Sequence, residues 1–129
     1  PGKVRQLAWS TPAMATGSPI VAAACVEGIT VWERGEKPQA GWQSQVLQHH
    51  QDRVNEIAFQ PDSFMLASAG QEGQIALWRE GRKLDQSLKV FSSGVSCLAW
   101  SPAGDRLLAG GNAGEIKQWH VAPRARGFG

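Results

Sequence analysis

Residues 54–78, VNEIAFQPDSFMLASAGQEGQIALW, decide the fold of this chain. Their apolar side chains come in short runs, which are separated by the turn-forming sequences QPDS at 60–63 and EG at 72–73. Short runs of strand-forming residues between such turns predict β-strands. The segment therefore predicts three consecutive strands, and residues 84–90 add a fourth strand whose more polar character suits a sheet edge.

Two other segments repeat this order of strands and turns. The first begins with VRQLAWS at residue 4 and closes at Trp32, and the last, VSCLAWSPAGDRLLAGGNAGEIKQW, closes at Trp119. The closing tryptophans are spaced by 46 residues from Trp32 to Trp78 and by 41 residues from Trp78 to Trp119. Four-stranded repeats of about 40–45 residues are typical of the blades of a β-propeller.

Composition excludes several classes of protein. The chain has 13 Lys+Arg against 11 Asp+Glu, a net charge of +2, which is too weak a field for a nucleic-acid partner. No apolar run approaches the roughly 18 residues that a membrane span needs, so we expect no span. Cys25 and Cys97 form no disulfide framework, and no signal peptide precedes the repeats, so we expect a reducing, cytoplasmic location.

The sequence resembles the WD-repeat β-propeller family over residues 4–119. The resemblance rests on an aromatic residue before a turn, a strand of small residues, a Gly-containing turn and a closing Trp, which recur in this order. It implies an all-β fold, a partial β-propeller of three WD-type blades with four antiparallel strands each, the last blade lacking its outer strand. We expect the blades at 1–47, 48–90 and 91–122, and a flexible basic tail at 123–129.

The resemblance also implies a structural tetrad, in which a His, a Ser or Thr, an Asp and the closing Trp are linked by hydrogen bonds. In the second repeat these positions hold His50, Ser68, Glu72 and Trp78, and Glu72 is one methylene longer than the Asp of the family. The third repeat has other residues at the first three positions, namely Phe91, Gly110 and Ala113. The first repeat has alanines in its Ser region. We therefore expect a degenerate member that is stabilised mainly by apolar burial.

The sequence predicts neither an enzyme nor a metal or cofactor site. Catalysis needs a convergent acid–base or nucleophile set, but the carboxylates fall mostly in turns, and Ser10 and Ser101 have no His at a meaningful spacing. The metal donors besides the carboxylates are few: His49, His50, His120, Cys25 and Cys97. They lack the short paired spacing of zinc sites, and both cysteines are interpreted as buried thiols in strands.

The function that the resemblance implies is a platform for proteins or peptides. In WD-repeat propellers the partner face is built by loops that enter the first strand and loops that join the second strand to the third. Here these loops supply Arg5, Arg53, Asn55, Gln71, Ser96 and Asn112. This polar, lightly basic set suits an acidic or amide-rich peptide. We therefore predict a non-catalytic interaction scaffold; the alternatives are a self-assembling half-propeller with a purely architectural role and, less favoured, a small-ligand or metal-binding module.

Three blades leave two blade faces without a neighbour, and such apolar faces need a cover. Propellers of this family commonly take the outer strand of the last blade from the far N-terminus of the same chain. We therefore expect the C-terminal part of a larger propeller, completed by a companion fragment or by a second copy of this chain, with the companion favoured. Trp42 lies outside the repeating positions and is interpreted as packing against the neighbouring blade, with a binding anchor as the alternative.

Overall fold

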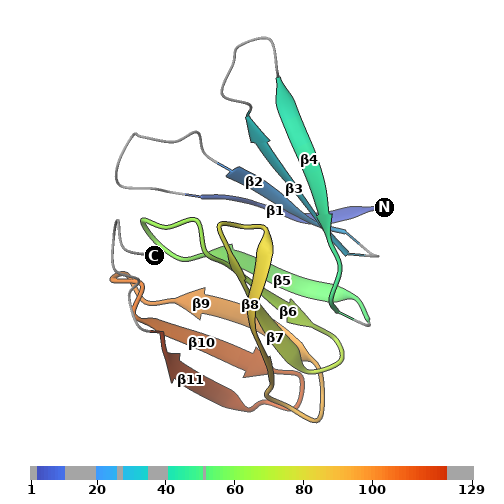
Figure 1. Cartoon of the computed structure of the whole chain (residues 1–129). Helices are drawn as coiled ribbons and strands as arrows, with labels where there is room; N and C mark the ends of the chain where they lie inside the picture. Colours follow the sequence, from blue (N-terminus) through green and yellow to red (C-terminus); the bar gives the residue numbers. More distant parts are fainter. Residues whose placement is uncertain (1–2, 11–19, 26–27, 35–40, 51, 122–129) are drawn as a thin grey trace.

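Over the residues that the structure describes, every regular element of the chain is a β-strand. This structure, a computed structural model, describes residues 3–10, 20–25, 28–34, 41–50 and 52–121. Within these ranges eleven strands form three antiparallel sheets, which follow one another along the molecule (Figure 1). In the same ranges no helix has the length and apolar character to cross a membrane.

Each sheet is a meander, and we refer to the three sheets as blades 1, 2 and 3. Blade 1 contains β1 (Val4–Trp9), β2 (Ile20–Cys25), β3 (Gly28–Arg34) and β4 (Trp42–Leu47). Blade 2 contains β5 (Val54–Phe59), β6 (Leu66–Gly70), β7 (Gln74–Arg79) and β8 (Lys83–Lys89). Blade 3 contains β9 (Val95–Trp100), β10 (Arg106–Gly111) and β11 (Ile116–His120).

This architecture confirms the expected all-β fold of propeller blades with four, four and three strands. The fourth strand of blade 2 runs over 83–89, one residue earlier than expected. Blade 3 has no fourth strand among the described residues. The predicted basic tail at 123–129 lies outside the part of the chain that the structure describes.

The tight turns follow from residues that accept unusual backbone angles. Asp62 lies in the β5–β6 turn with a φ of 57°, a left-handed conformation that Asp tolerates better than most residues. Gly73 lies in the β6–β7 turn with a φ of 91°. A Cβ at Gly73 would also overlap the carbonyl oxygen of Phe91, so this turn requires glycine in two respects.

The core lies between the blades, where the facing sides of neighbouring sheets are buried against each other. Strand β6, LASAG, consists mostly of small residues and is buried along its whole length. Because small side chains allow a close approach, β9 packs directly on β6. One apolar cluster joins blades 1 and 2 and includes Ile29, Ile57 and Leu66, all fully buried. A second cluster joins blades 2 and 3 around Ile75 and Leu107.

The closing tryptophans give the two faces of each blade different characters. Trp78 of blade 2 packs in the cluster shared with blade 1, and Trp119 of blade 3 packs in the cluster shared with blade 2. Each of these tryptophans therefore faces the preceding blade. In blade 1, Val31 belongs to the cluster shared with blade 2, so the strand alternation turns its neighbour Trp32 to the opposite face.

One expectation about the cysteines is wrong. Cys25 is buried in β2, as expected, but Cys97 is exposed in β9. Its side chain lies on the face of blade 3 that points away from blade 2, across from Gly110 of β10. No other blade among the described residues packs on this face, and the thiol is open to solvent.

Candidate interaction surfaces

Four side chains of blade 2 form a continuous hydrogen-bonded chain. The indole N–H of Trp78 donates to Ser68 Oγ at 2.9 Å, and Ser68 Oγ lies 2.7 Å from His50 Nε2. On the other side of the ring, His50 Nδ1 lies 2.5 Å from Glu72 Oε2. The structure thus brings together the four residues that the sequence analysis grouped, although they come from three separate segments of the chain.

The protonation of this chain follows from the burial of the imidazole. Burial lowers the pKa of His50, and it outweighs the hydrogen bond and the charge of Glu72, which act in the opposite direction. A neutral ring fits the pattern with Nδ1–H donating to the carboxylate of Glu72 and Nε2 accepting the Ser68 hydroxyl proton. Ser68 Oγ can then accept from Trp78, so every proton in the chain has an acceptor.

The Ser–His–Glu order resembles a nucleophile, base and acid, but the geometry is unsuited to catalysis. Ser68 has no exposed surface, and its oxygen already has hydrogen bonds with both Trp78 and His50. A nucleophile must meet its substrate, and no face of this hydroxyl is open to one. The arrangement therefore ties strands together, and its role as a structural tetrad stays a prediction that mutation can test.

Glycine at position 70 makes room for the long side chain of Glu72. A Cβ at Gly70 would overlap both carboxylate oxygens of Glu72 and would lie 2.5 Å from His50 Nδ1. The extra methylene of Glu72, which lies in the β6–β7 turn, is thus accommodated by the missing methyl group at the end of β6, two residues earlier. The spacing alone does not reveal this pairing, because it depends on how the Glu72 side chain turns back toward His50.

Three of the predicted partner-face residues meet where blade 2 joins blade 3. Asn55 Nδ2 donates to Gln71 Oε1 and to the carbonyl oxygen of Val95, both at 2.8 Å. A Cβ at Gly94 would lie 2.6 Å from Asn112 Nδ2 and 2.8 Å from the carbonyl oxygen of Gln71. The amide side chains of Asn55, Gln71 and Asn112 thus gather around the segment that enters β9. We call this group, together with Arg53, the amide cluster.

The remaining predicted residues lie nearby or apart. Arg53 is exposed, and its carbonyl oxygen accepts from the backbone N–H of Gln71 at 2.8 Å. Ser96 is exposed on β9 and donates to the carbonyl oxygen of Gly110 at 3.1 Å. Arg5 is exposed on β1, and no hydrogen bond within the described residues links it to the other five.

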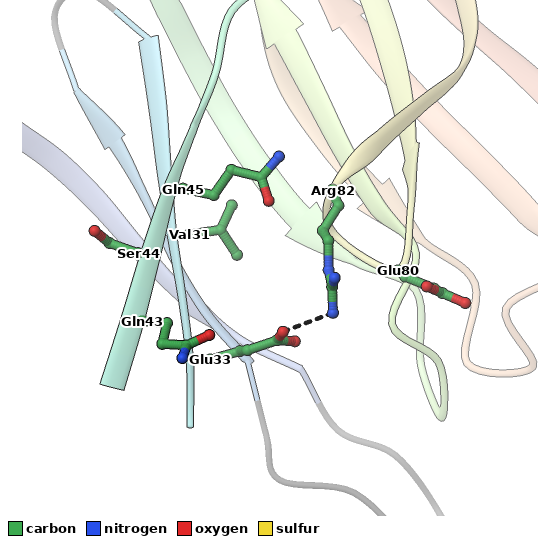
Figure 2. Close-up of a pocket in the computed structure, with 7 residues that line it drawn as sticks. All are labelled: Val31, Glu33, Gln43, Ser44, Gln45, Glu80 and Arg82. Atoms are coloured by element: carbon green, nitrogen blue, oxygen red, sulfur yellow. Dashed lines mark hydrogen bonds and ion pairs between the residues drawn. The ribbon is translucent and has the colours of Figure 1, made fainter. Parts of the chain in front are cut away.

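A small polar recess lies between blades 1 and 2, and sequence reasoning did not anticipate it. It is lined by Val31, Glu33, Gln43, Ser44, Gln45, Glu80 and Arg82. Figure 2 shows Glu33 and Arg82 pointing toward each other across the recess, where they form an ion pair of 2.6 Å. Both side chains are partly exposed, so this pair is screened and adds little stability. We therefore interpret the recess as part of the contact between blades 1 and 2, and we do not assign a ligand to it.

Metal ligation finds no support in the described residues. Nowhere in the described ranges do three or more His, Cys, Asp or Glu side chains gather closely enough to hold a metal ion. The adjacent histidines are engaged elsewhere, because His49 Nε2 lies 2.7 Å from Ser87 Oγ and His50 belongs to the hydrogen-bonded chain of blade 2.

The face of blade 1 that points away from blade 2 is apolar and open. Leu7, Trp9 and Trp42 are 64%, 57% and 51% exposed. Trp42 packs edge-to-face on Trp9 of its own blade, with ring centroids 6.5 Å apart, and its expected packing against a neighbouring blade stays a prediction. The alternation of polar and apolar residues along β1 contains a signal for this face, but the sequence alone does not say which face meets blade 2.

Comparison with known proteins identifies the protein family to which this chain belongs. Residues 41–79 and 83–120 match the family model "WD domain, G-beta repeat", and the chain belongs to the WD-repeat family. Each matched segment begins at the outer strand of one blade and ends at the third strand of the next, over β4–β7 and β8–β11. The sequence repeat is therefore offset by one strand from the sheet, and each repeat joins two blades. WD repeats mediate interactions between proteins.

The individual relatives are considerably longer than this chain. It is 35% identical over 77 residues to "WD repeat-containing protein 1" of Xenopus tropicalis, covering 57% of this chain and 13% of the relative. It is 30% identical over 115 residues to "Meiotic fizzy-related protein 2" of Schizosaccharomyces pombe, covering 88% and 21%. It is 26% identical over 99 residues to "Protein transport protein sec13" of Aspergillus oryzae, covering 70% and 33%.

Proposed function

We propose that this chain is a non-catalytic interaction scaffold whose amide cluster binds an acidic or amide-rich peptide. The proposal includes completion of the propeller by another chain or fragment. Membership of the WD-repeat family supports the general role, and the described surface supplies the chemistry. The exposed guanidinium of Arg53 attracts carboxylates, and the amides offer both donors and acceptors to a peptide backbone.

The observation that carries the proposal is the arrangement of Asn55, Gln71 and Asn112 around Gly94. Asn55 fixes the position of Gln71 through a hydrogen bond, and it also holds the carbonyl group of Val95. Side chains that are oriented by such bonds lose little entropy when a ligand binds. Asn112 is exposed beside this fixed pair, so its amide remains accessible to a partner.

Charge reversal tests the proposal. The double variant Arg5→Glu/Arg53→Glu is titrated with a fluorescently labelled peptide rich in Glu and Gln, and binding is followed by anisotropy. Each exposed charge contributes up to about 1 kcal/mol, and reversal adds repulsion, so we expect affinity to fall roughly five- to thirtyfold at low salt. The difference should shrink at high salt, because exposed charges are screened.

A matched control separates local from overall charge. The double variant Lys83→Glu/Arg106→Glu makes the same change in net charge, but its exposed residues begin β8 and β10, at the strand ends opposite the amide cluster. We expect the control to bind the peptide nearly as well as the unmodified chain. Equal affinities for the two double variants, or no binding of the peptide by the unmodified chain, would contradict the proposal and favour a purely architectural role.

A further inference from the structure

The two junctions between blades share one backbone contact. At the first junction, Gln6 Oε1 accepts from the N–H of Ile57 at 2.8 Å, and Gln6 Nε2 donates to the carbonyl oxygen of Ile57 at 3.1 Å. At the second junction, Glu56 Oε1 accepts from the N–H of Leu98 at 3.4 Å. Gln6 and Glu56 occupy the same place in their strands, because each is the second residue after the opening valine.

These contacts join the edge of one innermost strand to a side chain of the previous one. β1, β5 and β9 are the first strands of their blades, and each pairs with a neighbour on one side only. The peptide groups of Ile57 and Leu98 therefore point away from their own sheets, where the Gln or Glu of the preceding blade meets them. A bond in the reverse sense joins the same strands at the second junction, because the indole N–H of Trp100 in blade 3 donates to the carbonyl oxygen of Ala58 in blade 2 at 3.1 Å.

Blade 1 presents the same groups without a neighbour. Leu7 takes the place of Ile57 and Leu98, and Trp9 takes the place of Trp100. Ile57 packs against blade 1 and is only 1% exposed, whereas Leu7, on the open face of blade 1, is 64% exposed. By the shared register, the N–H and C=O groups of Leu7 point away from β2, toward the position of a preceding blade.

Blade 3 does not carry the side chain that this face requires. Its residue at the place of Gln6 and Glu56 is Cys97, whose thiol is a weak acceptor and cannot pair with a peptide N–H and C=O together. Stacking blade 3 of a second copy on blade 1 would therefore leave the peptide group of Leu7 without the partner that both internal junctions provide. A second copy is thus a poor cover for this face.

We infer that the open face of blade 1, formed by Leu7, Trp9, Trp32 and Trp42, docks a WD-type blade whose innermost strand has a Gln or Glu at the place of Gln6. This blade differs in sequence from blade 3 of the chain itself. The inference rests on the proposed completion of the propeller, and it gives the completing partner a recognisable chemistry. Apolar burial on the tryptophans supplies the attraction, and the amide or carboxylate sets the register of the two strands.

The chain itself provides the probe, because Cys97→Gln supplies the missing side chain. The mass of the unmodified chain and of this variant is measured by sedimentation equilibrium over a range of concentrations. The unmodified chain should remain near its monomer mass of 13.9 kDa, and Cys97→Gln should associate at least about tenfold more tightly, because two hydrogen bonds are gained. Cys97→Glu is the second variant, since Glu56 shows that a carboxylate serves at this place.

Two controls locate the contact. Ala99→Gln places the same side chain on the same exposed face of β9, two residues further along, and should leave the mass unchanged. The double variant Leu7→Glu/Cys97→Gln should lose the association, because a charge then replaces the apolar side chain at the docking face.

Three results would overturn the inference. They are self-association of the unmodified chain as tight as that of the Cys97 variants, monomeric behaviour of both folded Cys97 variants, and association that persists when Leu7 is changed. These results are independent of peptide binding. A chain that binds no peptide but associates through Cys97→Gln would refute the platform and leave the docking face in place.

Discussion

Replacing Ser68 with Ala tests the hydrogen-bonded chain of blade 2 at its centre. The hydroxyl is fully buried and has hydrogen bonds with two partners, Trp78 Nε1 and His50 Nε2. Those partners are also buried, with side-chain exposure of 2% for His50 and 4% for Trp78 as a residue. The substitution would therefore leave one donor and one acceptor without a partner and without water.

The expected loss of stability follows from those two orphaned groups. A buried polar group that loses its partner costs about 1–3 kcal/mol, so two of them lower the free energy of unfolding by about 2–6 kcal/mol. This is a large part of the roughly 5–15 kcal/mol that stabilises a typical domain. With a denaturant slope of about 1.5–2 kcal/mol per molar urea, the unfolding midpoint should fall by about 1–4 M.

A second serine provides a matched control. Ser87 also bonds a histidine, His49, at the same distance of 2.7 Å, but this pair is exposed to water. Ser87→Ala should therefore change the free energy of unfolding by less than about 0.5 kcal/mol. Urea unfolding followed by tryptophan fluorescence and by circular dichroism measures both variants. Equal midpoints for the two variants would refute the argument that burial makes the Ser68 hydroxyl important.

Three further predictions concern the same blade and the two thiols. Burial lowers the pKa of His50 below its unfolded value of about 6.5, so the unfolded chain takes up a proton on His50 before the folded chain does, and stability falls as the pH drops through that value. Thermal melts should show this loss of stability near about pH 6, and an equal loss in His50→Gln would contradict the prediction. Gly70→Ala should destabilise the chain by about 1–3 kcal/mol, because the new Cβ overlaps the Glu72 carboxylate. The same substitution should cost clearly less stability in a chain that also carries Glu72→Ala, and additive costs in this double-mutant cycle would argue against the overlap. A thiol reagent added to the native chain should modify Cys97 rapidly and Cys25 only on unfolding, so rapid reaction of two thiols would show that β2 is not buried.

The strands were predictable because their signals are local. The turn at 60–63 and the repeated tryptophans identify short strands without any knowledge of the partners. The pairing of Glu72 with Gly70 and the exposure of Cys97 were not predictable, because each depends on which side of a blade meets a neighbour. Strand alternation divides side chains between two faces, but it does not assign either face to a neighbour.

The contacts between blades were hidden for the same reason. Gln6 and Glu56 read in the sequence as ordinary polar residues of half-buried strands, whereas the structure places them against the peptide groups of the next blade. Asn55, Gln71 and Asn112 could be grouped from the sequence because the repeat aligns the segments in which they lie, and the structure places their side chains close together. Their role in binding a partner stays a prediction. Arg5 was grouped by the same alignment, yet no side-chain hydrogen bond within the described residues joins it to them.

The different faces of each blade also restrict the symmetry of any assembly. Since Trp78 and Trp119 each point toward the preceding blade, a blade offers one kind of surface in front and another behind. Two surfaces that differ in this way do not pair each with its own copy, so a contact between two copies joins the front surface of one to the back surface of the other. Contacts through them are heterologous, so they either close into a ring or continue as an open filament. A substitution that makes the front surface fit the back one therefore carries a risk of fibre formation whenever the rotation between neighbours fails to complete a full turn.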